Sequence, residues 1–175
     1  VDPVTYPASL HQSLDAVRFL REHAKGYNLD PTRVAVAGSS AGGELAALVA
    51  LTPQANLQAA VILNGVLDLT AMGDNSKMVT GYLGGTCTKM LVSCKAASPV
   101  SQVHAGAPPF YIGHGTADQT VPYSQAEAFA AGLRAAKVEV QLFTATDGPH
   151  TYWSKDAFYR RNRDDIASFL SIALR

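Results

Sequence analysis

The chain has 175 residues, of which 47% are apolar and 16% charged, and 14 basic side chains balance 14 acidic ones. This length and composition fit one globular domain and exclude a disordered chain. A net charge of zero gives no basis for binding nucleic acid or an anionic membrane surface. The longest apolar runs, such as residues 59–63, are far shorter than the roughly 20 residues of a membrane-spanning helix. We therefore expect neither a nucleic-acid partner nor a membrane partner.

The first half of the chain alternates between helix and buried strand. Apolar residues at helical spacing predict a helix over residues 9–25. The apolar, β-branched run at residues 33–37 predicts a strand buried on both faces. A tight turn at residues 38–42 leads into a helix over residues 41–51, and a second buried strand is predicted over residues 59–64.

The second half opens with a long connection, residues 65–108, with short helices predicted near residues 77–83 and 88–96. We expect this connection to be a small cap insertion over the site. A strand, a helix, a strand and a closing helix follow, over residues 109–114, 123–136, 138–144 and 155–174.

Four strands separated by helices predict an α/β fold with a mostly parallel sheet and helices on both faces. In such sheets the reactive groups lie at the carboxyl ends of the strands. Ser40, Asp68, Asp118 and His150 follow the four predicted strands in that order. We therefore expect these polar residues to meet at one edge of the sheet.

The turn Gly38-Ser39-Ser40-Ala41-Gly42 matches G-x-S-x-G between a strand and a helix. In this motif the serine is held in a strained conformation, and we expect side chains two residues to either side of it to collide with neighbouring backbone. We predict Ser40 as a nucleophile and the Ala41 N–H as an oxyanion donor at the positive end of the helix. Ser39 lies one residue too early for the nucleophile and is a candidate substrate-binding residue. The alternative is a simple packing turn.

Asp118, in a glycine-containing loop after the third strand, is the candidate acid, and Asp68 is the alternative. Loop aspartates also commonly serve as caps or turn formers. Of the five histidines, only His150 lies in a loop at the carboxyl end of the last strand, where a base is needed. The acid would orient this histidine and stabilise its charged form.

Several other residues leave two interpretations open. Tyr152 and Trp153 either line the substrate pocket or pack beneath the last helix, and Glu44 is expected to be a helix-start carboxylate rather than a catalyst. Cys87 and Cys94 form either a disulfide or two thiols. We expect a secreted protein in the first case and a cytoplasmic one in the second. Without a C-x-x-C motif or a His/Cys cluster we expect no metal.

Together these motifs resemble the α/β-hydrolase carboxylesterases, especially the hormone-sensitive-lipase-like and acetyl- or feruloyl-esterase-like branches. The resemblance is carried by the segments Asp30-Pro31-Thr32-Arg33-Val34, Gly38-Ser39-Ser40-Ala41-Gly42-Gly43 and His114-Gly115-Thr116-Ala117-Asp118, and by the His150 loop. It implies a Ser40, Asp118 and His150 triad that hydrolyses small carboxylic esters through an acyl-enzyme, without a cofactor. A serine peptidase of the same fold and a non-catalytic or incomplete hydrolase domain are the alternatives.

The chain departs from this family at its N-terminus. Family members carry further strands there and a His-Gly-Gly motif that completes the oxyanion hole, so we expect residues 1–175 to be a single truncated α/β-hydrolase domain. Loss of one oxyanion donor would slow the reaction by about 10²- to 10³-fold. The strand at residues 33–37 would become a sheet edge, and an open edge invites pairing with another chain. We therefore expect a homodimer through this edge, or association with the missing segment.

Overall fold

A computed structural model describes residues 5–175 and contains one four-stranded sheet with the order β1-β2-β3-β4. All neighbouring strands run parallel. The strands are β1 (Ala35–Ser39), β2 (Ala59–Leu63), β3 (Phe110–Gly115) and β4 (Val140–Ala145). The predicted α/β fold with a parallel sheet of about four strands is confirmed.

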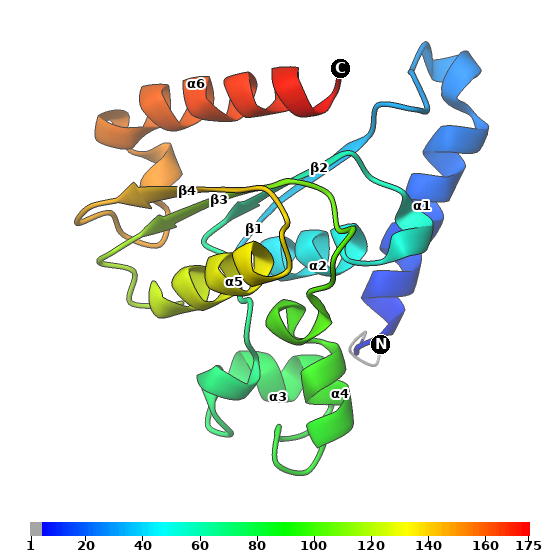
Figure 1. Cartoon of the computed structure of the whole chain (residues 1–175). Coiled ribbons are helices and arrows are strands. Elements are labelled where there is room, and N and C mark those ends of the chain that lie inside the picture. The colour runs from blue at the N-terminus through cyan, green and yellow to red at the C-terminus, as the bar shows by residue number, and fades with distance from the viewer. Residues whose placement is uncertain (1–4) are drawn as a thin grey trace.

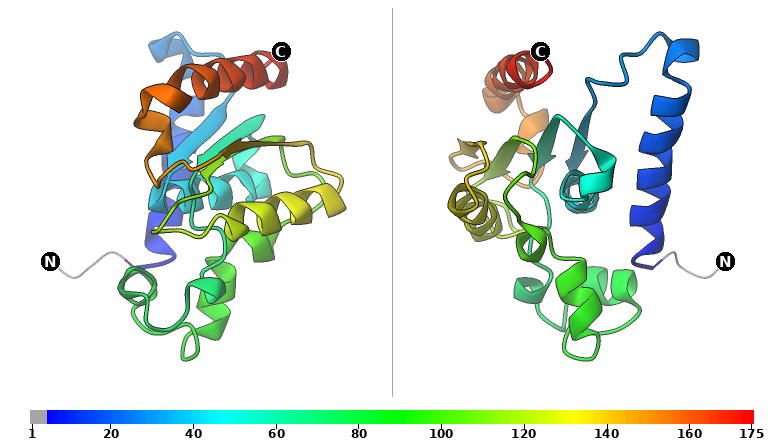
Figure 2. Two further views of the ribbon diagram at one scale, coloured as in Figure 1. Left: turned by 90° about the vertical axis from the view of Figure 1, so that its left-hand side faces the viewer. Right: turned by 45° about the vertical axis from the view of Figure 1, so that its right-hand side comes forward.

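Helices cover both faces of this sheet (Figures 1 and 2). α2 and α5 lie on one face and α6 lies on the other, while α1 packs beside α2. The helices are α1 (Ala8–Glu22), α2 (Ala41–Ala50), α3 (Lys77–Leu83), α4 (Leu91–Ala96), α5 (Ser124–Ala135) and α6 (Asp156–Ala173).

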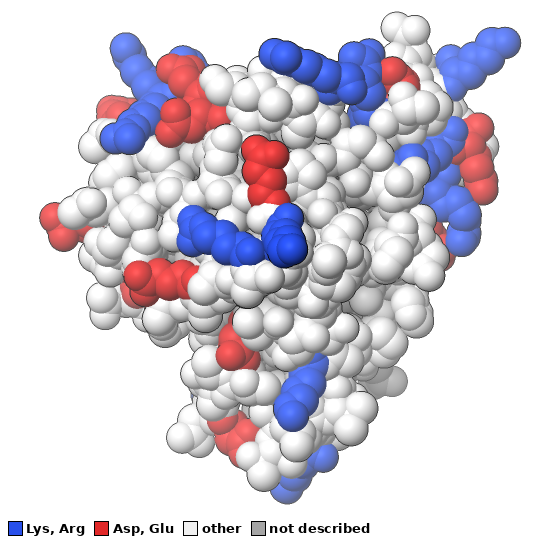
Figure 3. Space-filling model, viewed as in Figure 1, with Lys and Arg blue, Asp and Glu red and all other residues white. Residues whose placement is uncertain are grey.

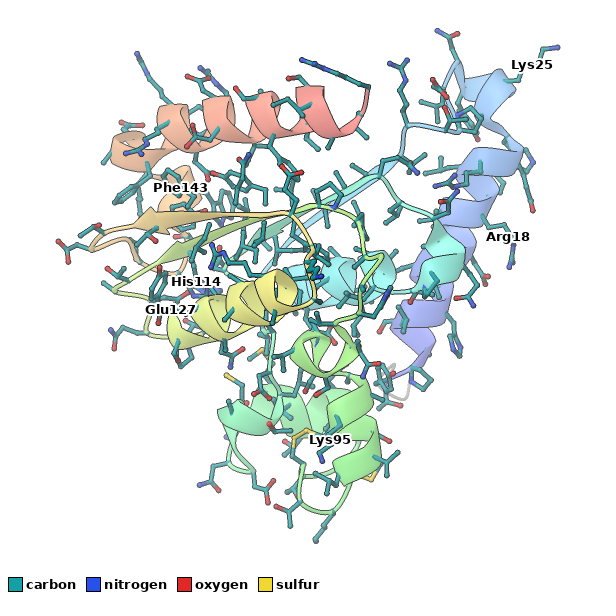
Figure 4. All side chains as sticks on the ribbon, viewed as in Figure 1. Arg18, Lys25, Lys95, His114, Glu127 and Phe143 are labelled. Carbon is teal, nitrogen blue, oxygen red and sulfur yellow. A yellow bond between two sulfur atoms is a disulfide. The ribbon has the colours of Figure 1, made fainter. Side chains whose placement is uncertain are left out.

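The helices on both faces of the sheet explain why its central strands, β2 and β3, are almost entirely buried. In β3, Phe110 and Ile112 pack into the core shared with α2 and α5, whereas Tyr111 packs with Phe169 of α6. Successive side chains of a strand point to opposite faces, so a sheet covered on both sides buries both sets. Figure 4 shows Phe143 between β4 and α6, and His114 between the sheet and α5.

β1 begins and ends two residues later than predicted, and it is not buried on both faces. Arg33 belongs to a surface turn, where its Nε lies 2.7 Å from Oδ2 of Asp30. The strand instead extends to Ser39, which pairs with Leu63 of β2. Ala37, in the middle of β1, is exposed, because within the described residues β1 pairs only with β2.

Residues 65–108 form a separate group of short helices below the sheet in Figure 1. They enclose their own small core, which includes Leu69, Val79 and Leu83. Cys87 and Cys94 are joined by a disulfide with their Cα atoms 5.3 Å apart. Of the two alternatives left open by the sequence, the structure therefore has the disulfide and not two free thiols.

Basic and acidic side chains are interspersed on the face shown in Figure 3, with no large area of one sign. Over residues 5–175, none of the helices has the length and apolar character needed to cross a membrane.

Candidate active site

Ser40 lies in the sharp turn between β1 and α2 with φ 54° and ψ −125°, a conformation that non-glycine residues rarely adopt. Local hydrogen bonds hold it there. The Ser40 N–H donates to the Leu63 carbonyl over 3.0 Å, and the Ser40 carbonyl accepts from the N–H groups of Gly43 and Glu44. The turn therefore fixes Ser40 at the carboxyl end of β1, with its side chain partly exposed.

The glycines of this turn do not all serve the same purpose. A Cβ at Gly38 would overlap the carbonyl of Gly42, and a Cβ at Gly43 would lie 2.9 Å from the Cα of Gly65. A Cβ at Gly42 would meet nothing within 4 Å. The expected collision is therefore correct at Gly38 but wrong at Gly42, because the helix approaches β2 one residue later, at Gly43.

Three of the predicted residues come together at the carboxyl edge of the sheet. His150 Nε2 lies 3.0 Å from Ser40 Oγ, and His150 Nδ1 lies 2.7 Å from Asp118 Oδ2. Ser40 follows β1, Asp118 follows β3 and His150 follows β4. Residues separated by up to 110 positions in the sequence thus form one continuous chain of hydrogen bonds.

The other oxygen of Asp118 is held by backbone. Oδ1 accepts from the N–H groups of Thr120 at 2.8 Å and Val121 at 2.9 Å. Burial raises the pKa of Asp118, but hydrogen bonds from the Val121 N–H, His150 and the Thr120 N–H outweigh it, so the pKa lies below its usual value. Asp118 is therefore an anion facing His150 at neutral pH.

Asp68, the alternative acid, takes a different role. Its Oδ1 accepts from the N–H groups of Thr70 and Ala71 at 2.9 and 3.2 Å. These bonds stabilise the turn at the start of a short 3-10 helix, Thr70–Met72. Asp118, and not Asp68, is the carboxylate that contacts His150.

His114 supports the Asp118 loop from inside the protein. It is fully buried, and its Nε2 lies 2.9 Å from the Val121 carbonyl and 3.1 Å from Asp118 Oδ2. Burial lowers the pKa of His114, although the Val121 carbonyl and Asp118 oppose this effect. A neutral His114 thus donates from Nε2 and ties the loop back to β3.

The first turn of α2 supplies free backbone donors beside Ser40. Within residues 5–175, the N–H groups of Ala41 and Gly42 have no hydrogen-bond acceptor. Such N–H groups point out of the start of a helix, where its dipole favours negative charge. The predicted oxyanion donor Ala41 therefore lies in an exposed position immediately next to Ser40.

Asn64, which the sequence analysis did not single out, contacts the candidate base. Its Nδ2 lies 3.4 Å from Nδ1 and 3.3 Å from Nε2 of His150. Its Oδ1 accepts from Trp153 Nε1 over 3.0 Å. Asn64 directly follows β2 and is 1% exposed. The available signal was a polar residue at the end of a buried strand, the same signal that marks Asp118.

Of the three candidate substrate-binding residues, Tyr152 has the alternative role predicted for it, packing beneath the last helix. Tyr152 is fully buried and packs against Phe143 and Phe158, with its hydroxyl 3.2 Å from Asn162 Oδ1 of α6. Its ring is therefore part of the core beneath α6 rather than a pocket wall. Trp153 remains partly exposed beside the site, and Ser39 is half-buried at the end of β1.

A cavity of about 450 Å³ opens beside Ala41 and Gly42, and most of its wall is apolar. Glu44 also lines it and is 3% exposed. Burial raises the pKa of Glu44 to about 8, and the nearby Tyr82 hydroxyl offsets part of the rise. Glu44 thus lies in the first turn of α2, as predicted, and its raised pKa keeps it mainly protonated at neutral pH. Among residues 5–175, no group of three His, Cys, Asp or Glu side chains could hold a metal ion.

A parallel sheet with serine, aspartate and histidine at the carboxyl ends of its strands, in that chain order, defines an α/β-hydrolase. The chain belongs to the BD-FAE family, whose profile matches residues 1–133. The resemblance to α/β-hydrolase carboxylesterases is thereby confirmed.

Known relatives extend this likeness over nearly the whole chain. Esterase LipQ of Mycobacterium tuberculosis is 31% identical over 187 residues, which cover 96% of this chain and 44% of LipQ. The chain thus spans less than half the length of that relative.

Solved structures agree with this assignment. Esterase 2 of Thermogutta terrifontis, phosphoramylated by tabun, is 27% identical with a TM-score of 0.78, over 96% of this chain and 65% of the esterase. A truncated carbohydrate esterase from gut microbiota has the same fold, with a TM-score of 0.87 at 21% identity over 97% of this chain and 69% of that one.

Proposed function

We propose that this chain is the catalytic part of a serine esterase that hydrolyses small carboxylic esters through a Ser40, His150 and Asp118 triad. The observation that carries the proposal is the continuous hydrogen-bonded chain from Ser40 Oγ through His150 to Asp118, at 3.0 and 2.7 Å. The esterase names of the relatives support the reaction class.

The proposed reaction follows from these contacts. His150 Nε2 accepts the proton of Ser40 Oγ while the oxygen attacks the ester carbonyl carbon. The Asp118 anion stabilises the imidazolium, and the Ala41 N–H donates to the developing oxyanion. The alkoxy group then leaves with the proton from His150. Water, deprotonated by the same imidazole, attacks the acyl-enzyme, and His150 returns this proton to Ser40 Oγ as the carboxylic acid is released.

A fluorophosphonate probe separates this proposal from a non-catalytic domain that retains the triad. An activated Ser40 forms a phosphonyl adduct, which peptide mass spectrometry locates on the segment containing residues 38–42. A protein that stays unlabelled, while a known serine esterase labels in the same tube, would contradict the proposal. A labelled protein that cleaves peptide bonds but no ester would favour the serine peptidase alternative.

Residues 65–108 are proposed to act as a cap that forms part of the substrate pocket. Val66, Leu69, Met78 and Val79 from this segment line the cavity next to Ala41. An acyl group bound there would have its carbonyl oxygen within reach of the Ala41 N–H.

We also propose that the open edge of β1 pairs with a second copy of the chain. Ala37 is exposed at this edge, and such edges pair readily with other strands. Light scattering after gel filtration should give twice the chain mass, and Ala37→Pro, which introduces a residue that pairing strands tolerate poorly, should give a monomer. A monodisperse wild-type monomer at high concentration would contradict this proposal.

The Cys87–Cys94 disulfide supports the proposal that the protein works in an oxidising compartment. Alkylation of thiols in freshly lysed source cells, before any oxidation, should leave both cysteines unlabelled. Labelling of both would instead favour the cytoplasm.

A further inference from the structure

The cavity beside Ala41 combines an apolar wall with one buried acidic group. Its volume of about 450 Å³ lies in the range of small-molecule pockets. Val66, Leu69 and Val79 form one side, and Leu45 of α2 contributes to the other. Among the lining residues within the described range 5–175, Glu44 is the only Asp or Glu.

Glu44 is an unusual wall residue because one of its oxygens lacks a partner. The side chain is 3% exposed, yet Oε1 has no hydrogen-bond partner within residues 5–175. Buried polar atoms in folded proteins are nearly always paired with protein, water or ligand. The unpaired oxygen therefore identifies a place where a bound molecule could supply the missing hydrogen bond.

The position of Glu44 on α2 relates this oxygen to the reaction centre. Glu44 follows Ala41 by three residues, so both lie on the same side of the helix, and helical side chains tilt toward the N-terminus. The Cβ atoms of Ala41 and Glu44 are therefore roughly 5–6 Å apart, and both residues line the same cavity. A substrate whose carbonyl oxygen binds the Ala41 N–H would place the second or third carbon of its acyl chain next to Glu44.

The chemistry around Glu44 favours a neutral hydroxyl as its partner. Because burial raises the pKa of Glu44 to about 8, the carboxyl is mainly protonated at neutral pH and can both donate and accept. Burial and the charge of Glu44 raise the pKa values of the neighbouring Tyr6 and Tyr82 hydroxyls. Ser9 Oγ lies 3.3 Å from the Tyr82 hydroxyl. This group of hydroxyls and a carboxylic acid matches a hydroxyl ligand better than a cation.

We propose that this cavity binds the acyl group of the ester and that Glu44 recognises a hydroxyl on its second or third carbon, so that short hydroxyacyl esters are preferred substrates. The inference rests on the proposed esterase function. It adds a specificity-determining residue that belongs to neither the triad nor the oxyanion site.

The test compares ethyl 3-hydroxybutyrate, as separate enantiomers, with ethyl butyrate by titrating the released acid at constant pH. The wild type should show a kcat/KM at least about fivefold higher for one hydroxybutyrate enantiomer, as expected for a hydrogen bond to a buried and otherwise unpaired group. Glu44→Leu should invert this ratio, because it removes the polar partner. Glu44→Gln, whose amide also donates and accepts, should retain part of the preference.

Glu127 offers a matched control, since it lies exposed on α5 away from the cavity (Figure 4). Glu127→Leu should leave the ratio unchanged. A wild type that does not distinguish the esters, or a Glu44→Leu variant that keeps the wild-type ratio, would overturn the inference while leaving the esterase proposal intact.

A binding measurement keeps the two proposals separable if neither ester is hydrolysed. In that case the esterase proposal fails, and calorimetry on the Ser40→Ala variant still measures recognition of each ester. Tighter binding of ethyl 3-hydroxybutyrate than of ethyl butyrate, lost on adding Glu44→Leu, would support the inference. Equal binding of the two esters would overturn it.

Discussion

The amide nitrogen of Asn64 lies over the face of the His150 ring, at nearly equal distances of 3.4 and 3.3 Å from its two nitrogens. An in-plane position at these distances would collide with the carbon between the nitrogens, so only the ring face is available. The bond from Trp153 Nε1 to Asn64 Oδ1 turns the amide so that its N–H groups face the ring. Amide-to-ring contacts of this kind are weak but directional, and this one fixes the imidazole between Ser40 and Asp118.

Removing this support should slow catalysis without abolishing it. We expect Asn64→Ala and Trp153→Phe each to lower kcat for p-nitrophenyl acetate by about tenfold, because small displacements of a catalytic group are costly. KM should change less than twofold and the melting temperature by only a few degrees. A kcat equal to that of the wild type in both variants would show that His150 is positioned by Asp118 and Ser40 alone.

Alanine substitutions at Gly38 and Gly42, two glycines of the same turn, should change the stability of the protein in different ways. Gly38→Ala would force a methyl group into the Gly42 carbonyl and should cost about 3 kcal/mol or more of unfolding free energy. Gly42→Ala has open space around its Cβ and should be neutral or stabilising by up to about 1 kcal/mol, because alanine favours the helix. Urea denaturation measures both. Equal losses of stability would mean that the turn is packed differently from the structure described.

Glu44 should make stability depend on pH. Its folded-state pKa of about 8 lies above the value of 4.5 for an exposed glutamate, so the folded protein binds this proton more tightly than the unfolded chain. The stability gained is complete below pH 4.5 and is lost as the pH rises through 8. The loss is on the order of a few kcal/mol.

Glu44→Gln removes this titration. Its melting temperature relative to the wild type should therefore rise by about 5 °C or more between pH 5 and pH 8.5, while Glu127→Gln at the exposed position should show no such trend. Parallel curves for the wild type and Glu44→Gln would contradict the raised pKa.

The disulfide should contribute measurably to the stability of the 65–108 segment. Closing a loop of this size lowers the conformational entropy of the unfolded chain and so raises its free energy by roughly 2–3 kcal/mol. Both cysteines also lie in the small core of the segment. The double variant Cys87→Ala and Cys94→Ala should therefore lower the unfolding free energy by about that amount. An unchanged urea midpoint would show that the packing of Leu69, Val79 and Leu83 holds the segment without the bond.

The hydrogen-bonded arrangement of Ser40, Asp118 and His150 could be predicted from the sequence because its signals are local. Ser40, Asp118 and His150 each follow a predicted strand, and parallel strands bring their carboxyl ends to one edge. The burial of individual side chains could not be predicted in the same way. Tyr152 is in the core because α6 covers it, and Glu44 is buried because residues 65–108 and the start of α1 fold over it.

The position of β1 at the edge of the sheet could not be predicted from the sequence either. Its sequence is as apolar as that of a central strand, yet Ala37 is exposed, because the composition of a strand does not specify what lies beside it. Asn64 was missed for a different reason, since a single asparagine after a strand matches no catalytic motif.

The most direct test of the proposed function is hydrolysis of p-nitrophenyl acetate by this 175-residue chain, compared with Ser40→Ala and with Ser124→Ala, an exposed serine on α5. We predict burst release of p-nitrophenol in the wild type and Ser124→Ala, and none above the buffer rate in Ser40→Ala. Equal rates in all three proteins would contradict the assignment of Ser40 as the nucleophile.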